Sequence, residues 1–209
     1  MPLVWGYDAG LGALLLEAIP SEIPLSELGM VIELDEVANL IASLHRSGAP
    51  LVGNGVVSFA ERVEFIFEHW IERHRRRGEV ATRAVPIERL RRGQELAREL
   101  VVDVGVPVLL HGDLHPGNVL YGGAARGLVA IDPRPCVGEA AVDAVDWVFW
   151  AVDDPRAWEP RSRDLAMALG VDQERLWAWC AAFAAMLAAS KAARGAAAKE
   201  VAALLALAP

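Results

Sequence analysis

Lysine and cysteine are both scarce in this sequence of 209 residues. The only lysines are Lys191 and Lys199, both close to the C-terminus. The only cysteines are Cys136 and Cys180, and they do not form a C-x-x-C pair. A disulfide framework is therefore not indicated, and a reducing cytoplasm is the expected compartment.

An excess of positive charge is also missing. The chain has 20 Lys and Arg against 28 Asp and Glu, which gives a net charge of −8 at pH 7. Because phosphate contacts need clustered Lys and Arg, this balance argues against a nucleic-acid partner and suits a cationic small molecule better. Met1 is followed by PLVWGYD, which lacks the basic start of a signal peptide. The uncharged run at 176–190 is short for a membrane span, so we expect a buried helix there and no membrane partner.

Apolar residues make up 54% of the chain, enough for a substantial core, and their spacing changes along it. Residues 3–8 and 12–17 resemble two strands joined by a turn that contains glycine. Residues 118–132 form the pattern of a short hairpin, and Ser58 with Glu61 forms the pattern of a capping box at a helix start. The pattern predicts an α+β fold that is mostly helical, with helices over residues 28–44, 59–77 and 86–105 and in the remainder after the hairpin.

A polar segment, HGDLHPGNVL at residues 111–120, lies between two apolar runs. Its Asp113 and Asn118 are five residues apart, and Asp132 ends the next expected strand. The hairpin brings Asp132 back beside Asn118, so two carboxylates and an amide oxygen are expected at one cleft. Mg²⁺ prefers such oxygen ligands, and phosphoryl transfer needs an aligned hydroxyl and metal ions over the phosphates. The sequence therefore predicts that Asp113 accepts the proton of a hydroxyl, while Asn118 and Asp132 hold Mg²⁺.

The same segment resembles the kinase catalytic loop, H-R-D-x-x-x-x-N, with its later metal-binding Asp. Here the two motifs are HGDLHPGN and AIDP. Gly112 in place of the arginine, and Pro133 after Asp132, resemble the aminoglycoside phosphotransferase family. The continuation at residues 131–148 is similar to its branch of streptomycin 6-phosphotransferases and hydroxyurea phosphotransferases. The resemblance implies a protein-kinase-like fold and an enzyme that uses ATP and Mg²⁺ to phosphorylate a hydroxyl of a small antibiotic-like molecule.

The resemblance also implies roles for single residues. It makes Asp113 the catalytic base, Asn118 and Asp132 the metal ligands, and Asp143 a carboxylate that braces the loop through its backbone. His111 and His115 are expected to support the loop rather than to take part in the chemistry.

The segment LLLEAIP resembles the link between the two lobes of a kinase. The backbone of Glu17, Ala18 and Ile19 is therefore expected to pair with adenine. Residues 1–20 are then the last strands of the N-terminal lobe with the hinge, and residues 21–209 are the helical C-terminal lobe.

Two features of such kinases have no counterpart. Gly10 and Gly12 are followed by Leu15 where a third glycine of a phosphate-covering loop belongs, and no lysine lies near the first strands. We therefore expect most of the N-terminal lobe to be missing, the chain alone to bind Mg·ATP weakly, and an apolar patch to be exposed where two copies could form a homodimer. A catalytically silent remnant or binding module of the same fold is the alternative function.

The polar residues also allow different roles. The 111–118 segment could be a tight loop held by Asx-type hydrogen bonds. His111, Asp113 and His115 could instead be ligands of a hydrolytic zinc site. Asp146, Asp153 and Asp154 could form an acidic patch for a cationic substrate, or be solvated helix caps.

Overall fold

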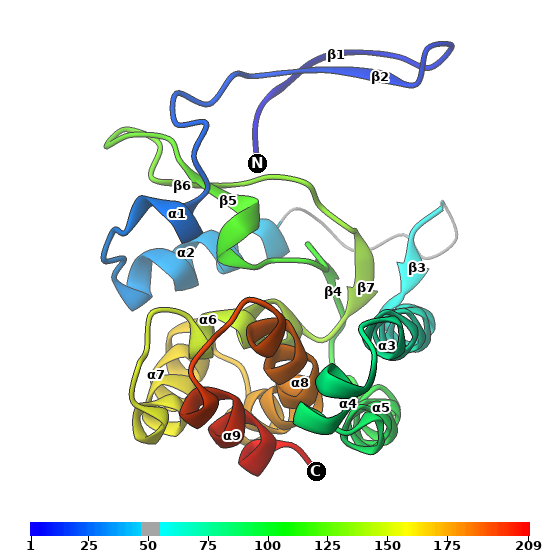
Figure 1. Ribbon diagram of the computed structural model, residues 1–209. Helices are drawn as coiled ribbons and strands as arrows, with labels where there is room; N and C mark the ends of the chain where they lie inside the picture. Colours follow the sequence, from blue (N-terminus) through cyan, green and yellow to red (C-terminus); the bar gives the residue numbers. More distant parts are fainter. Residues whose placement is uncertain (47–54) are drawn as a thin grey trace.

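The computed structural model describes residues 1–46 and 55–209. Figure 1 shows three levels: a two-stranded hairpin at the top, a middle level of short strands with two helices, and a body of packed helices at the bottom. Most of the regular structure is helical and the strands are short, so the expected α+β class is confirmed.

The top level is an antiparallel hairpin of β1 (Val4–Asp8) and β2 (Ala13–Leu16). Its turn is closed by Asp8, whose Oδ1 accepts hydrogen bonds from the amides of Gly10 at 2.8 Å and Leu11 at 3.0 Å. The two strands lie where the sequence predicts them. They are separate from the other strands and pair only with each other among the described residues.

The middle level corrects the expected helix at 28–44. The structure has a single turn, α1 (Leu25–Leu28), and then a separate helix, α2 (Leu34–His45). Gly29 follows α1 with φ of 61°, a left-handed conformation that ends a helix and that glycine adopts without strain. The second helix begins with a capping box of Glu33 and Glu36. Apolar spacing alone does not reveal this interruption.

Two small sheets complete the middle level. The expected hairpin is present as β5 (Val119–Tyr121) and β6 (Leu128–Ala130), with Val119 opposite Ala130. The other sheet has the strand order β3-β7-β4. Its members are β3 (Val57–Ser58), β4 (Val108–Leu110) and β7 (Cys136–Gly138). The polar segment 111–118 therefore runs from one sheet to the other.

The first helices of the body begin close to where the sequence predicts them. The capping box of Ser58 and Glu61 opens α3 (Phe59–Arg76), and a short α4 (Glu79–Ala84) that the apolar pattern does not indicate comes next. Pro86 is the N-cap of α5 (Ile87–Leu100), which ends five residues before the expected Gly105. β-branched valines follow Leu100 and favour a helix less than the residues before them.

The rest of the body is built around α8 (Gln173–Ala193), which packs against α5 and against α9 (Ala198–Leu207). A helix that is apolar on all sides belongs in a protein core or a membrane. Among the described helices, α8 is the one whose length and composition would allow a membrane span, and half of that window is buried inside the molecule. The elements packed beside it include α6 (Val145–Phe149) and α7 (Trp158–Leu169).

Candidate active site

The polar segment 111–118 forms a tight loop between β4 and β5. It ends in the 3-10 helix η1 (Pro116–Asn118), whose first residue is the proline. The Nδ1 atom of His115 accepts a hydrogen bond from the amide of Gly117 at 3.0 Å, and the carbonyl of His115 accepts one from the amide of Asn118 at 2.8 Å. His115 thus caps the turn that places Asn118 at the start of β5.

A buried carboxylate holds the first residues of this loop. Asp143, in the 3-10 helix η2 (Ala140–Ala144), is 3% exposed. Its Oδ2 accepts a hydrogen bond from the amide of His111 at 2.8 Å, and its Oδ1 accepts one from the amide of Gly112 at 3.0 Å. Two buried backbone donors of the loop are satisfied in this way, and leaving them without an acceptor would cost free energy.

His45 is the residue of this network that sequence reasoning missed. Its Nε2 lies 3.0 Å from Oδ2 of Asp143, 98 positions along the chain. It is the last residue of α2, and nothing in the local pattern separates it from an ordinary histidine near a helix C-terminus. The contact ties α2 to the loop through the same carboxylate.

Gly112 explains why this loop has no arginine at its second position. Its φ is 76°, and a Cβ atom placed there would lie 2.1 Å from the carbonyl oxygen of Arg134. The amide of Arg134 in turn donates a hydrogen bond to the carbonyl of His111 at 2.7 Å. The two backbone segments are therefore packed against each other more closely than any side chain allows.

Asn118 and Asp132 are neighbours across the β5–β6 hairpin. The carbonyl of Asn118 accepts a hydrogen bond from the amide of Ile131 at 2.9 Å, directly before Asp132. The side-chain Nδ2 of Asn118 donates to the carbonyl of Asp113 at 2.9 Å, so its Oδ1 is the atom left to face a cation. Asp132 has a φ of 51°, which is uncommon for a residue other than glycine, and its carboxylate is exposed. An amide oxygen and an exposed carboxylate at one edge fit the hard-oxygen ligands that Mg²⁺ prefers.

The carboxylate of Asp113 is about half exposed and lies 3.9 Å, Oδ1 to Nε2, from His115. His111 points elsewhere, with its Nε2 donating to the carbonyl of Ile131 at 3.0 Å. Burial lowers the pKa of His111, which favours the neutral ring. In residues 1–46 and 55–209 no three or more His, Cys, Asp or Glu side chains are grouped to hold a metal ion. The structure therefore does not assemble the zinc-ligand alternative of His111, Asp113 and His115.

The hinge segment lies beside the β5–β6 hairpin. The amide of Glu17 donates to the carbonyl of Leu3 at 2.8 Å, so that amide is already in use. The carboxylate of Glu17 accepts hydrogen bonds from the amide of Leu3 and from Arg126, and both hold its pKa below the usual range. Ala18 is exposed, whereas Ile19 packs with Leu120, Val129 and Ile131 in a small apolar cluster next to Asp132.

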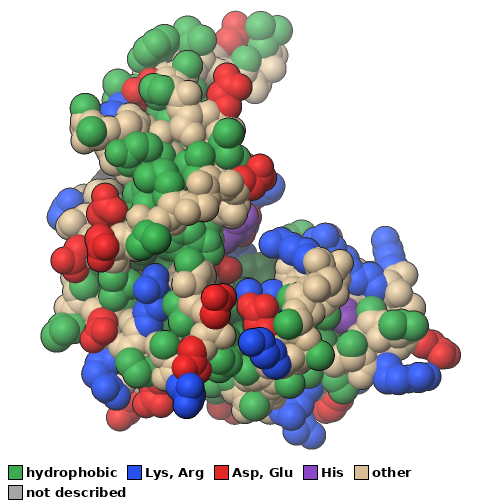
Figure 2. All heavy atoms as spheres, turned by 60° about the vertical axis from the view of Figure 1, so that its left-hand side comes forward, with side chains coloured by type: hydrophobic (Ala, Val, Ile, Leu, Met, Phe, Trp, Pro, Cys, Tyr) green, Lys and Arg blue, Asp and Glu red, His purple; other side chains and the backbone are tan. Residues whose placement is uncertain are grey.

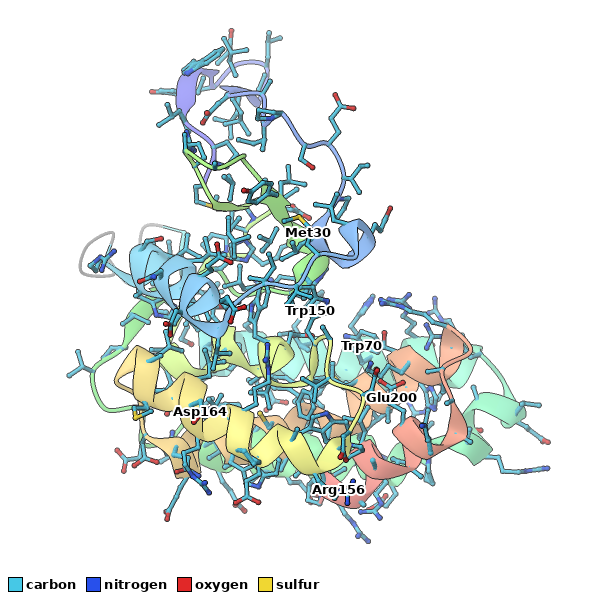
Figure 3. The ribbon with its side chains drawn as sticks, turned by 90° about the vertical axis from the view of Figure 1, so that its left-hand side faces the viewer. Met30, Trp70, Trp150, Arg156, Asp164 and Glu200 are labelled. Atoms are coloured by element: carbon cyan, nitrogen blue, oxygen red, sulfur yellow. The ribbon has the colours of Figure 1, made fainter. Side chains whose placement is uncertain are left out.

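The acidic patch of Asp146, Asp153 and Asp154 is not a uniform group. Asp154 caps the 3-10 helix η3 (Pro155–Ala157) and forms an ion pair with Arg156 at 2.9 Å, so its charge is used locally. Asp146 differs because it is partly buried in α6, near Asp113 and His115. Burial raises the pKa of Asp146 to about 6. Figure 3 shows Trp150, the residue that directly follows α6, below the middle level.

We expect Asp146→Asn to stabilise the protein at neutral pH and not at acidic pH. The folded protein keeps the proton of Asp146 up to about pH 6, whereas an unfolded chain releases it near pH 4. The folded state therefore binds more protons in this window, and the free energy of unfolding falls as the pH rises through it. Removing the charge should raise the free energy of unfolding by about 3 kcal/mol at pH 7.5 and by little at pH 4.

Denaturant unfolding at both pH values measures this effect. The exposed Asp153→Asn is the matched control, and its stability should not change at either pH. A gain for Asp146→Asn that is equal at pH 4 and pH 7.5 would contradict the assignment of the buried charge.

Comparisons with known proteins show the family and the fold of this chain. A family model described as "Aminoglycoside/hydroxyurea antibiotic resistance kinase" matches residues 3–195. No curated protein matches the chain. The expected kinase-like α+β fold is confirmed by the solved structures that resemble it, which are 15–19% identical.

Three of these structures resemble nearly the whole chain. The choline kinase LicA from Streptococcus pneumoniae is 16% identical with a TM-score of 0.60, over 98% of this chain and 74% of that one. The macrolide 2'-phosphotransferase MphH from Brachybacterium faecium is 19% identical with a TM-score of 0.57, over 100% and 73%. The GDP complex of wild-type aminoglycoside 2'-phosphotransferase-IIIa is 15% identical with a TM-score of 0.55, over 99% and 73%.

Proposed function

We propose a function from the premise that this chain belongs to the aminoglycoside/hydroxyurea antibiotic resistance kinase family of small-molecule phosphotransferases. The chain is proposed to transfer the γ-phosphate of ATP to a hydroxyl of a small antibiotic-like molecule. The observation that carries this proposal is the placement of Asp113, Asn118 and Asp132. The amide side chain of Asn118 reaches the backbone of Asp113, and the backbone of Asn118 reaches the residue before Asp132. These two contacts support the proposal that Asp113, Asn118 and Asp132 act together beside the β5–β6 hairpin.

Asp113 is proposed as the residue that faces the acceptor. Its carboxylate is open to solvent, and its backbone is fixed on both sides, by Asn118 and by the capped turn of His115. A carboxylate held in this way can accept a hydrogen bond from the acceptor hydroxyl and take its proton as the phosphoryl group is transferred. His115 lies beside Asp113 and can orient the same carboxylate.

Asn118 and Asp132 are proposed to hold Mg²⁺. When bound, Mg²⁺ neutralises the charge of the phosphate oxygens. Asn118 contributes its free Oδ1, and Asp132 contributes an exposed carboxylate whose nearest cation, Arg134, lies 3.8 Å away. The backbone of Asn118 is hydrogen-bonded to His115 and to Ile131, the residue before Asp132, which limits the movement of both proposed ligands.

ATP is proposed to lie along the hinge. Its adenine would contact the backbone of Glu17, Ala18 and Ile19 and lie next to Ile131, the partly exposed member of the apolar cluster that also contains Ile19, Leu120 and Val129. Ile131 directly precedes Asp132, so this cluster and the proposed metal ligands are continuous along the chain. Apolar side chains beside a few polar groups are typical of the lining of a ligand site.

The acceptor is proposed to carry a positive charge, as aminoglycosides and streptomycin do, with a hydroxyurea-like compound as the other class. Figure 2 shows a hollow between the upper levels and the helical body, with histidine and acidic side chains on one wall and Lys or Arg side chains on the other. Asp146 adds a second carboxylate near Asp113, and its burial makes a charged partner favourable there. We also propose that the protein works in the cytoplasm, where ATP is available.

A catalytically silent remnant of this fold is the second candidate function. We propose that residues 1–20 are the last strands of an N-terminal lobe with its hinge, and that residues 21–209 are the C-terminal lobe. The observation that favours a weak or silent site is the position of the lysines, because Lys191 lies in α8 and Lys199 in α9. Neither is on the hairpin strands, where a kinase lysine would contact the phosphates.

An acceptor panel distinguishes the two candidates. The chain is incubated with Mg·ATP at millimolar concentration, because we propose weak nucleotide binding, and with aminoglycosides, streptomycin, hydroxyurea and neutral small alcohols. We expect phosphorylation of at least one cationic acceptor, detected by mass spectrometry. Transfer to no acceptor supports the silent remnant, and transfer only to neutral alcohols contradicts the proposed class of acceptor.

A further inference from the structure

The buried carboxylate of Asp143 has three donors, and one of them comes from a distant helix. Its Oδ1 accepts from the amide of Gly112, and its Oδ2 accepts from the amide of His111. The Nε2 atom of His45, 3.0 Å from the same Oδ2, is the third donor, because an ionised carboxylate only accepts hydrogen bonds. The side chain of His45 is 10% exposed and that of Asp143 1%, so water does not readily replace this contact.

His45 fixes how the carboxylate of Asp143 is turned. The terminal torsion of an aspartate side chain has a broad, roughly twofold distribution, so this torsion alone does not hold the two oxygens in place. The loop amides cannot hold them against the rest of the protein, because these amides are the groups to be positioned. His45 provides a contact from outside the loop. It is itself fixed, because it ends α2, which packs against β4, β6 and α7.

The position of Asp113 depends on the orientation of this carboxylate. The side chain of Asp113 is about half exposed, so its place is set mainly by the backbone. After the residue, the backbone is held by Asn118, whose side chain donates to the carbonyl of Asp113. Before the residue, it is held by the amide of Gly112, which donates to Asp143. A shift of Asp143 is therefore transmitted to Asp113 through a single intervening residue.

We propose that His45 is a positioning residue of the phosphoryl transfer, because by holding Asp143 it keeps the carboxylate of Asp113 aligned with the acceptor hydroxyl. This inference rests on the proposed function, since it makes the rate of that reaction depend on His45. Phosphoryl transfer needs an aligned base, acceptor and phosphate, and a misplacement of about 1 Å can cost on the order of 10²-fold in rate. His45 acts through Asp143 and takes no part in the chemistry.

Three substitutions of His45 test this role, with His69 as the matched control. Leucine removes the donor and keeps an apolar side chain of similar size. Glutamine keeps a donor at the distance of Nε2, whereas the shorter asparagine places its donor at the position of Nδ1. His69→Leu removes a histidine that is exposed on α3.

Initial rates in the acceptor assay give the first readout. We expect His45→Leu and His45→Asn to lower kcat by roughly 10- to 100-fold and to leave the KM values for Mg·ATP and for the acceptor unchanged. His45→Gln should restore most of the rate, and His69→Leu should keep all of it. A purely structural role would instead reduce the amount of folded protein and leave the kcat of the folded fraction unchanged.

Amide hydrogen exchange followed by NMR gives a second readout that needs no activity. The amides of His111 and Gly112 should exchange about tenfold faster in His45→Leu than in the unchanged chain. The amide of Ile131 should not change, because its acceptor lies outside this network. Equal acceleration at all three amides indicates global destabilisation and overturns the positioning role.

The two readouts separate the failure of this inference from that of the proposed function. Transfer to no acceptor by the unchanged chain contradicts the proposed function, and the exchange of the two loop amides then decides alone whether His45 holds the loop. Unchanged exchange at both amides overturns the inference, and so does faster exchange with an unchanged kcat. If His45→Leu fails to fold, as judged by circular dichroism, the more polar His45→Asn takes its place.

Discussion

Asp113→Asn is expected to lower phosphoryl transfer by about 10²- to 10⁴-fold, the usual contribution of a positioned general base. Asparagine keeps the size of the side chain but cannot take the proton of the acceptor hydroxyl. The backbone of Asp113 makes the structural contact to Asn118, so the substitution leaves that hydrogen bond in place. Nucleotide affinity should therefore stay the same, because Asn118 and Asp132 are proposed to hold the metal.

Initial rates with the best acceptor of the panel, together with calorimetric titration of Mg·ATP, separate these two effects. Asp164→Asn is the matched control, since Asp164 is exposed on α7, away from the loop (Figure 3). The control should keep both the rate and the affinity. An Asp113→Asn variant that loses affinity and rate equally would place Asp113 on the nucleotide rather than on the acceptor.

Gly112→Ala is expected to destabilise the fold by about 3–5 kcal/mol. Part of this cost is the left-handed backbone, with φ of 76°, which any residue with a Cβ adopts under strain. The larger part is the contact of the new Cβ with the carbonyl oxygen of Arg134, since 2.1 Å is far inside van der Waals distance. Relief would require the 111–118 loop and the segment after Asp132 to move apart, which breaks the hydrogen bond from Arg134 to His111.

Gly123→Ala isolates the contact from the backbone strain. Gly123 has a φ of 82°, but a Cβ there would meet nothing within 4 Å. The free energy of unfolding of Gly123→Ala should therefore fall by only about 1–2 kcal/mol. Denaturant unfolding of both glycine variants measures the difference. If the two variants lose stability equally, the close approach at Gly112 is not the dominant cost.

The sequence predicts those parts of this molecule that depend on near neighbours in the chain. The capping box of Ser58 and Glu61, the cap at Asp154 and the β5–β6 hairpin all form within a few residues, and each lies where the pattern allows it. The turn at the end of the 111–118 loop also belongs to this group, because Pro116 and the cap by His115 define it.

Other features depend on contacts that no local pattern contains. The interruption after α1 follows from one glycine whose left-handed conformation is set by the surrounding fold. The need for glycine at position 112 comes from Arg134, 22 residues later, and the role of His45 comes from Asp143, 98 residues later. The pattern groups Asp146 with two exposed aspartates because sequence carries no direct information on burial. Apolar spacing predicts which face of a helix is buried, but it does not predict which charged side chains are buried between helices.

The carboxylate of Asp143 also has a consequence for the order in which the chain folds. It joins the end of α2 to the loop at residues 111 and 112, and all three parts must be present before its hydrogen bonds can form. His45 leaves the ribosome 98 residues before Asp143, which at about 5–20 residues per second is a delay of about 5–20 s. Until Asp143 emerges, the loop amides have no buried acceptor. The loop therefore reaches its final geometry late in folding, because this geometry depends on a contact between distant parts of the chain. The end of α2 can be connected to the candidate active site only after Asp143 has been synthesised.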